Sequence, residues 1–464
     1  MREVYDAGNS GEEMNPCGAG RFSPVFFSAA FLIFVSPASS LWAQRPAEVP
    51  HANHGREAPR LKFVVILSRH GVRPPTWTQD RLDAYSAQPW PHWSVPPGYL
   101  TPHGYELLKR FSSFDRASLA AAGLIAADGC ADAAHTYIWT DTDERTIESG
   151  RALAEGLFPG CPPLAHSRVA GERDPLFHPG ARDAIPAGAQ AEKHEPETQA
   201  TSKPDAEQDR LLVEMQNVLK GCSPADPCTP ARAPAMLLLG VQGAETSDKS
   251  GMSSESRQPL SLGASFAEDF LLEYTEGMPS DQIGWGKVDE PQILRFMTLH
   301  TEHTELSDRA PVRARMGASN LLFHIERTLE QRVDGGTVED AIGAVDSKIV
   351  LIVGHDTNIA EVAALLGVHW TIDGRKDDTP PGTELAFELW QSEGGAYSVR
   401  VTVSMQTLRQ MREMQDLTPS APPAREALTL QGCEATTQTC GWKNFMQIAD
   451  AAIDKTYTIT AGSN

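Results

Sequence analysis

The sequence of 464 residues lacks a Cys-x-x-Cys pair, an excess of basic residues and any apolar run long enough to cross a bilayer. Since none of the seven cysteines stands at the close spacing of zinc fingers and thiol oxidoreductases, zinc binding and thiol redox chemistry are not expected. The formal charge of −21 repels polyanions at long range, which argues against a nucleic-acid partner. An apolar fraction of 41% nevertheless fits an ordinary globular protein with a large core.

The one long apolar segment, residues 25–35, has the length of a secretory h-region and is too short for a transmembrane helix. Small residues up to Ala43 follow it and offer sites for a signal peptidase. The acidic residues ahead of Met14 do not fit a positively charged n-region, whereas a start at Met14 restores the signal pattern. We therefore expect a signal peptide over residues 1–43; the alternative is a buried N-terminal helix.

A signal peptide predicts a periplasmic or secreted protein that has no membrane anchor after processing. Six cysteines remain outside the signal, and an even number in an exported chain indicates disulfides. Sequence alone leaves their connectivity open. The local spacings favour three pairs: Cys130 with Cys161, Cys222 with Cys228, and Cys433 with Cys440.

Two continuous apolar runs, residues 63–67 and 349–353, are typical of strands buried on both faces. His70 follows the first run closely, and His355 follows the second. A third short strand, residues 136–140, runs into a cluster of charged residues. In open α/β sheets, ligands collect at the carboxyl ends of the strands, so these three strand ends predict a single site.

The chain divides into segments of different character. After a polar linker over residues 44–60, strand signals predict an α/β domain made of residues 61–181 and 309–464. Residues 182–308, between these two parts, begin polar and continue with helical periodicity. We expect them to form a smaller, mostly helical inserted domain.

Two patterns within the helical segment suggest further features. Ser265 and Glu268 resemble a capping box at a helix start. His300 and His303 share one helical face, as metal ligands can, but they lack the HExxH spacing. We therefore expect a solvated helix face at the two histidines and no metal site.

Arg69, His70 and Arg73 stand together directly after the first buried strand, and this set suits a phosphate monoester. Planar guanidinium groups donate paired hydrogen bonds to phosphate oxygens, and an unprotonated imidazole nitrogen can attack phosphorus in line. His355 extends the set at the second strand end, where Asp356 is the adjacent carboxyl able to protonate a leaving alkoxide. The sequence therefore predicts two-step phosphoryl transfer.

The charges around His70 also predict its protonation state. Neighbouring guanidinium groups disfavour an imidazolium ion, so the pKa of His70 should fall and leave the ring nucleophilic in mild acid. Asp356 must be protonated when it acts, so activity should decrease as the pH rises through its pKa.

Residues 69–74 with Thr76 resemble the RHGxRxP signature of the histidine acid phosphatases, and the His-Asp pair after the second strand resembles their C-terminal HD motif. Arg145, near the charged start of a predicted helix, matches the downstream arginine of the same family. The similarity extends over residues 61–442 and is closest to bacterial periplasmic phytases and glucose-1-phosphatases.

The resemblance implies that His70 is the phospho-accepting nucleophile and that Asp356 is the proton donor. It assigns the substrate phosphate to a set of binding residues: Arg69, Arg73, Arg145 and His355, with Thr76 lining the pocket. It also implies an α/β fold whose mixed sheet carries helices on both faces, plus a smaller helical inserted domain. No metal or other cofactor is expected, and the protein should act as a monomer on a small-molecule phosphate ester.

Two residues bear on the choice of substrate. Thr357, after the HD pair, resembles the phytase form of that motif and favours phytate. Trp77 stands where enterobacterial phytases carry a lysine that helps to hold the charged inositol phosphate, and this departure weakens the phytase interpretation. Phytate is the expected substrate, and a glucose-1-phosphatase or a broad-specificity acid phosphatase is the alternative. Two alternatives belong to other classes: a phosphoglycerate-mutase-like mutase, against which export argues, and a non-enzymatic phosphosugar-binding protein.

Overall fold

The computed structural model describes residues 58–179, 206–226, 228–230, 232–239 and 259–460, all within one unit, Arg56–Asn464. The expected signal peptide and nearly all of the linker after it lie outside these residues. Among the described helices, none combines the length and the apolar character needed to cross a bilayer.

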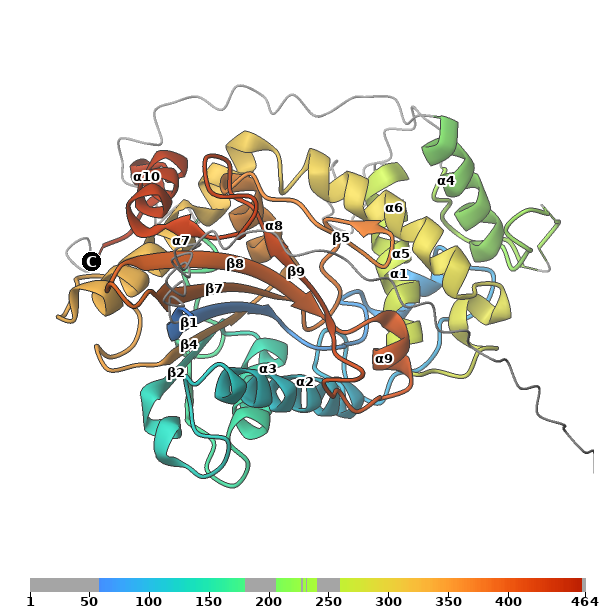
Figure 1. Ribbon diagram of the computed structural model, residues 1–464. Coiled ribbons are helices and arrows are strands. Elements are labelled where there is room, and N and C mark those ends of the chain that lie inside the picture. Colours follow the sequence, from blue (N-terminus) through green and yellow to red (C-terminus); the bar gives the residue numbers. More distant parts are fainter. Residues whose placement is uncertain (1–57, 180–205, 227, 231, 240–258, 461–464) are drawn as a thin grey trace, which may run out of the picture. The chain divides into compact units, whose positions relative to one another are not determined.

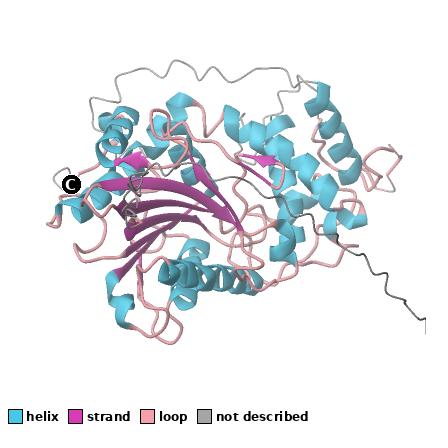
Figure 2. Cartoon of the chain, viewed as in Figure 1, coloured by secondary structure: helices cyan, strands magenta, loops and turns pink. Residues whose placement is uncertain are grey.

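The described strands form an eight-stranded sheet and a separate two-stranded ribbon (Figures 1 and 2). The order in the large sheet is β10-β8-β7-β1-β4-β2-β3, with β9 also paired to β8. Its strands are β1 (Arg60–Arg69), β2 (Thr136–Thr140), β3 (Ala165–His166), β4 (Ile349–Gly354), β7 (Glu384–Gln391), β8 (Tyr397–Met405), β9 (Ala424–Leu428) and β10 (Cys440–Gly441). The ribbon pairs β5 (Thr371–Ile372) with β6 (Arg375–Lys376).

The large sheet is mixed. Strands β1 to β4 run parallel to one another, whereas β7 to β10 pair antiparallel. The helices are α1 (Gln79–Asp83), α2 (Pro102–Ala121), α3 (Glu144–Leu157), α4 (Ala206–Leu219), α5 (Pro259–Thr275), α6 (Glu290–Leu306), α7 (Pro311–Asp334), α8 (Asp356–Leu365), α9 (Leu408–Arg412) and α10 (Trp442–Ala452). This arrangement confirms the predicted α/β fold class.

Helices cover both faces of the sheet, which explains why β1 and β4 read as continuous apolar runs. Alternate residues of β1 enter different cores: Val65 packs with residues of α7, α8 and α10, while Val64 packs with residues of α2 and α3. Figure 1 shows these two helix layers on opposite sides of the strands. Both faces of the central strands are therefore dry.

A third apolar core lies among α4, α5 and α6. Phe266 and Phe270 of α5 stack on Trp90, at ring-centroid distances of 5.7 and 5.4 Å. Trp90 precedes α2 and belongs to the segment expected in the α/β domain, as does Val72 of the same core. The helical core thus includes chain on both sides of the expected boundary, and the division into two domains stays a prediction.

The capping box expected at Ser265 and Glu268 is wrong. Both residues lie well inside α5, and the Ser265 hydroxyl donates a hydrogen bond to the Ser261 carbonyl at 3.0 Å. A serine inside a helix commonly bonds back to the carbonyl four residues earlier, so its presence three residues before a glutamate does not identify a helix start.

The three locally spaced cysteine pairs form disulfides in the structure, as predicted. The pairs are Cys130 with Cys161, Cys222 with Cys228, and Cys433 with Cys440. The first joins the segment before β2 to the segment after α3, and the other two close short loops after α4 and before β10.

Candidate active site

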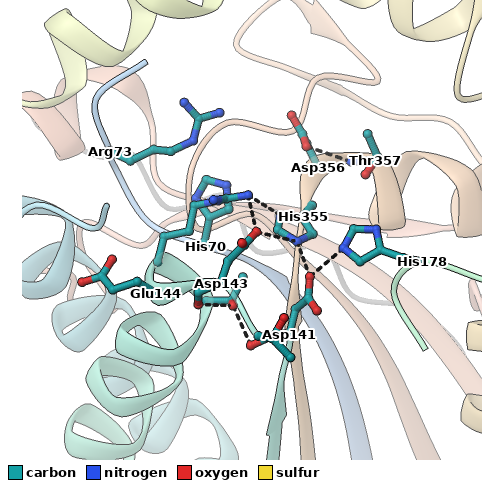
Figure 3. A network of polar contacts seen from close by, with 12 residues as sticks. His70, Arg73, Asp141, Asp143, Glu144, His178, His355, Asp356 and Thr357 are labelled. Atoms are coloured by element: carbon teal, nitrogen blue, oxygen red, sulfur yellow. Dashed lines mark hydrogen bonds and ion pairs between the residues drawn. The ribbon is translucent and has the colours of Figure 1, made fainter. Parts of the chain in front are cut away.

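Three neighbouring parallel strands end at the same edge of the sheet. Arg69 at the end of β1 pairs with Gly354 at the end of β4, and Thr140 at the end of β2 pairs with Val353. The residues that follow these ends therefore meet, as the sequence predicted. Figure 3 shows His70, Asp141 and His355 converging there.

His70 is held in one orientation and one tautomer. Its Nδ1 lies 2.8 Å from the Gly71 carbonyl oxygen, so Nδ1 carries the proton and donates it, which leaves a lone pair on Nε2. The His70 backbone N–H donates to the Gly354 carbonyl, and its own carbonyl accepts from the Gly382 N–H, each at 3.0 Å. The side chain is buried, with 1% exposure.

Burial, followed by the charges of Arg69, Arg73 and Arg145, holds the pKa of His70 well below its ordinary value. The predicted lowering is therefore confirmed, but burial is a larger cause than the neighbouring arginines on which the prediction was based. The imidazole is neutral in mild acid, as a nucleophile must be.

The two motif arginines share a carboxylate that sequence reasoning missed. One Glu268 oxygen accepts from the Arg69 Nη2, and the other lies 3.5 Å from the Arg73 Nη2. Arg69 also donates through Nη1 to the Thr379 carbonyl. Burial alone would raise the pKa of Glu268, but Arg73 and Arg69 outweigh it and keep that pKa below its ordinary value. Two guanidinium groups therefore contact one carboxylate, and the same arrangement of donors suits the oxygens of a phosphate group.

His355 is the N-cap residue of α8, and a second missed carboxylate fixes its ring. The Asp141 Oδ2 lies 2.7 Å from the His355 Nε2 and 2.8 Å from the His178 Nε2 (Figure 3). Burial would raise the pKa of Asp141, but the hydrogen bonds from His178 and His355 hold it well below its ordinary value. The carboxylate therefore turns the other nitrogen of His355, Nδ1, toward Arg145, whose Nη2 lies 3.4 Å away.

Asp356 is the first residue of α8 and lies beside Arg69. Its Oδ1 accepts from the Thr357 N–H at 2.9 Å, and its Oδ2 lies 3.4 Å from the Arg69 Nη2. Burial would raise the pKa of Asp356, but Arg69 and His300 lead the charges that hold it well below its ordinary value. In the site without phosphate, Asp356 is therefore a carboxylate.

His300 does not belong to a solvated helix face. Its side chain is 14% exposed, and its ring lies with Glu268 and Asp356 in one cluster whose ligand-type atoms are within 4.8 Å of one another. The expectation of solvation is wrong for His300 because α6 packs against the site. The three side chains could bind a cation, but the guanidinium groups already paired with both carboxylates oppose that use.

Arg145 and Thr76 lie at the mouth of the site, where both line one pocket. Arg145 stands in the first turn of α3 and pairs with Asp143 at 2.6 Å. Trp77 packs against the helical core and does not line this pocket; its ring centroid lies 5.9 Å from that of Phe266. The structure thus brings together all seven residues predicted for the site: Arg69, His70, Arg73, Thr76, Arg145, His355 and Asp356.

Comparison with known proteins provides an independent observation. A model of the histidine phosphatase superfamily (branch 2) matches residues 60–230 and 310–404. The chain belongs to this superfamily. The matched residues of this histidine phosphatase contain both predicted motifs, while Glu268 and His300 lie between the two matched regions.

Named relatives agree with that membership. This phosphatase is 33% identical over 427 residues to phytase AppA of Escherichia coli K12, covering 87% of this chain and 95% of the relative. It is 28% identical to a glucose-1-phosphatase of Salmonella typhimurium, covering 81% and 88%. The structure of a Hafnia alvei phytase in complex with myo-inositol hexakis sulphate superposes with a TM-score of 0.71 at 29% identity, covering 86% of this chain and 99% of the other. The predicted enzyme class, a hydrolase acting on phosphoric monoesters, is confirmed.

Proposed function

We propose that this protein is an exported acid phosphatase that hydrolyses phosphate monoesters through a phosphohistidine on His70. One observation supports the proposal most directly. The Nδ1 of the buried, neutral His70 imidazole donates a hydrogen bond to the Gly71 carbonyl, which leaves Nε2 unprotonated in a site with three arginines. A nucleophile of low basicity in a cationic site suits attack on a phosphate dianion.

In the first step, Arg69, Arg73 and Arg145 bind the non-bridging oxygens of the ester, and the carboxylate of Glu268 gives way to the phosphate. The His70 Nε2 then attacks phosphorus while the bond to the ester oxygen breaks. His355, oriented by Asp141 through Nε2, directs its Nδ1 toward Arg145 and so helps to hold that guanidinium group at the transferred phosphate.

Asp356 supplies the proton that the leaving alkoxide takes. Its carboxyl is ionised in the free site because Arg69 and His300 lie beside it. A bound phosphate places negative charge next to those cations, which favours protonation of Asp356 in the complex. In the second step, water attacks phosphorus, the bond between phosphorus and the His70 Nε2 breaks, and Asp356 takes up the proton of that water. Phosphate leaves, and Asp356 releases its proton to solvent, which returns the free enzyme.

Phytate and glucose 1-phosphate are the leading substrate candidates. Two named relatives are a phytase and a glucose-1-phosphatase. Thr357 favours phytate, whereas Trp77, in place of the phytase lysine, argues against it. No metal or other cofactor enters the proposed chemistry. The proposal includes export and a monomeric state, and the three disulfides support an oxidising compartment.

The deciding experiment measures phosphate release from phytate, glucose 1-phosphate and an aryl phosphate in mild acid with a chelator present. Rapid quenching into alkali, followed by mass spectrometry, should detect phosphate on His70. The His70→Ala variant should retain no turnover and no trapped phosphate. Substantial activity in that variant would refute the nucleophile, phosphoryl transfer to a second ester without phosphate release would indicate a mutase, and binding without turnover would indicate a binding protein.

A further inference from the structure

The four residues that follow β1, residues 70–73, rest on the first turn of α2. We call them the nucleophile loop, because they include the proposed nucleophile and one of the phosphate-binding arginines. The Val72 carbonyl accepts a hydrogen bond from the Thr101 N–H at 3.0 Å, and Thr101 is the N-cap residue of α2. A Cβ on Gly104 would lie 2.5 Å from the Val72 carbonyl oxygen, so this close approach requires glycine. The position of the loop therefore depends on its contacts with α2.

The Thr101 side chain provides a second contact to this loop. Its Oγ1 accepts from the Gly104 N–H at 2.9 Å, as an N-cap hydroxyl does, and lies 3.3 Å from the Val72 carbonyl oxygen. It also lies 2.6 Å from Oε2 of Glu276, the residue that follows α5. Thr101 is buried, with 1% exposure, so these protein groups are the partners available to its hydroxyl.

The hydroxyl has one proton and two oxygen acceptors within reach. If Glu276 is ionised, its carboxylate can only accept, so the Thr101 proton points to it and the Val72 carbonyl loses that donor. If Glu276 is protonated, it donates to the Thr101 Oγ1, whose own proton is then free for the Val72 carbonyl. The proton on Glu276 therefore decides whether Thr101 holds Val72 by one hydrogen bond or by two.

Burial raises the pKa of Glu276 to about 7, although its hydrogen bond to the threonine hydroxyl lowers it. The group is therefore protonated in mild acid and ionised in mild alkali. Two basic side chains near this end of α5, of His103 in α2 and Arg412 in α9, bond to backbone carbonyl oxygens. Arg73, in the nucleophile loop, lies against the carboxylate of Glu268.

We propose that Glu276 is a positioning residue for the nucleophile loop: its proton turns the Thr101 hydroxyl toward the Val72 carbonyl and so holds the loop in place. In mild alkali the carboxylate takes that hydroxyl, and the loop is held by one hydrogen bond fewer. Activity then decreases with rising pH for a second reason, in addition to the ionisation of Asp356. This inference rests on the proposed function, because it assumes that the loop binds and attacks phosphate.

The test compares kcat/KM of the full-length Glu276→Gln variant with that of the wild type on an aryl phosphate, whose leaving group needs little protonation by Asp356. The glutamine amide keeps the shape and donates to Thr101 at every pH, as the protonated acid does. The ratio of variant to wild type should be about one at pH 5 and about five at pH 8.5, which is the effect of one hydrogen bond. Ionisation of the substrate is common to both proteins and cancels from this ratio.

The dissociation constant for inorganic phosphate gives a second readout that needs no turnover. Calorimetric titration should show equal affinity of the two proteins at pH 5 and tighter binding by Glu276→Gln at pH 8.5, because the loop that carries an arginine ligand is better held.

Glu326→Gln is the matched control. Glu326 is also a buried carboxyl group with a pKa of about 7, but it belongs to α7 and interacts with Asp450 and Lys455. This variant makes the same chemical change and should give a ratio of about one at both pH values. Circular dichroism at pH 5 and pH 8.5 checks that each variant is folded.

Changes at Thr101 test the route of the effect. Thr101→Ser keeps the hydroxyl and should retain the response to Glu276→Gln. Thr101→Val removes the hydroxyl, and in that background Glu276→Gln should give the same ratio at both pH values. A ratio that still changes with pH in Thr101→Val would mean that the charge of Glu276 acts at a distance, which overturns the proposal.

The remaining outcomes separate this proposal from the proposed function. If the kcat/KM ratio is the same at pH 5 and pH 8.5, or if Glu326→Gln changes it equally, Glu276 does not position the loop, while the phosphatase chemistry stands. If the wild type hydrolyses no ester and no phosphohistidine is trapped, the proposed function itself fails, and phosphate binding by the two proteins still decides the role of Glu276.

Discussion

Glu361 is a buried carboxyl group whose protonation should make the stability of the fold depend on pH. It lies on α8, five residues after Asp356, and its side chain rests against the backbone of α7: a Cβ on Gly317 would be 2.2 Å from each carboxylate oxygen. Glu361 is 7% exposed. Burial first, and then the negative charge of Asp308, raises the pKa of Glu361 to about 8.

The sign of the pH effect follows from where the proton is bound. Below the ordinary glutamate pKa of 4.5, the folded and unfolded chains both hold the proton. As the pH rises toward 8, the unfolded chain loses it while the folded chain retains it, so the free energy of unfolding decreases. A shift of about 3.5 pH units at about 1.4 kcal/mol per unit sets an upper limit of about 5 kcal/mol for this loss.

The perturbation is Glu361→Gln, which keeps the shape and removes the titration. Urea unfolding with intact disulfides should give the variant a free energy of unfolding close to that of the wild type at pH 4.5. At pH 8 the variant should be the more stable protein by several kcal/mol, at most about 5. Glu393→Gln, in an exposed turn, is the control and should follow the wild type at both pH values.

Other buried carboxyl groups, such as Glu276 and Glu326 with a pKa of about 7 each, also lower the wild-type stability as the pH rises. They are unchanged in the variant, so the difference between the two proteins isolates Glu361. If that difference is the same at pH 4.5 and pH 8, Glu361 is ionised in the folded protein and the reasoning is refuted.

Two further predictions concern the proposed chemistry. Asp356→Asn should lower kcat for alkyl phosphates by about 10²–10⁴ and for aryl phosphates much less, because aryl leaving groups need little protonation; stopped-flow kinetics that show equal losses would contradict a proton-donor role. Asp141→Asn should lower kcat about tenfold to hundredfold for every ester, because the carboxylate that orients His355 is lost. His178→Gln, which removes the other partner of Asp141, should cost less, and a larger loss in His178→Gln than in Asp141→Asn would overturn this assignment.

Much of the site could be predicted because its parts follow strands of distinctive sequence. The apolar runs that become β1 and β4 mark strands buried on both faces, and the parallel pairing of those strands brings His70 and His355 to one edge. Short-range features could be predicted equally well, because the cysteines that lie six and seven residues apart form the expected disulfides.

The carboxylates of the site were harder to predict from the sequence. Glu268 is 199 residues away from Arg69 in the chain, and nothing around it in sequence distinguishes it from other glutamates of a helix. Asp141 was visible only as one member of a charged cluster, and the distance of 37 residues to His178 conceals their shared hydrogen bond. His300 looked solvated because a helical pattern does not reveal which neighbour packs against each face.

By itself, the sequence predicted the fold class, the three strands whose ends meet at one site, and the histidines, arginines and carboxyl group proposed for phosphoryl transfer. These features depend on residue type and on short spacings along the chain. Only the tertiary structure decided which carboxylates neutralise the arginines, which nitrogen of His70 stays free, and which side chains surround the candidate site. Those features depend on burial and on electrostatic contacts between distant segments, which arise only when the sheet and the helices pack together.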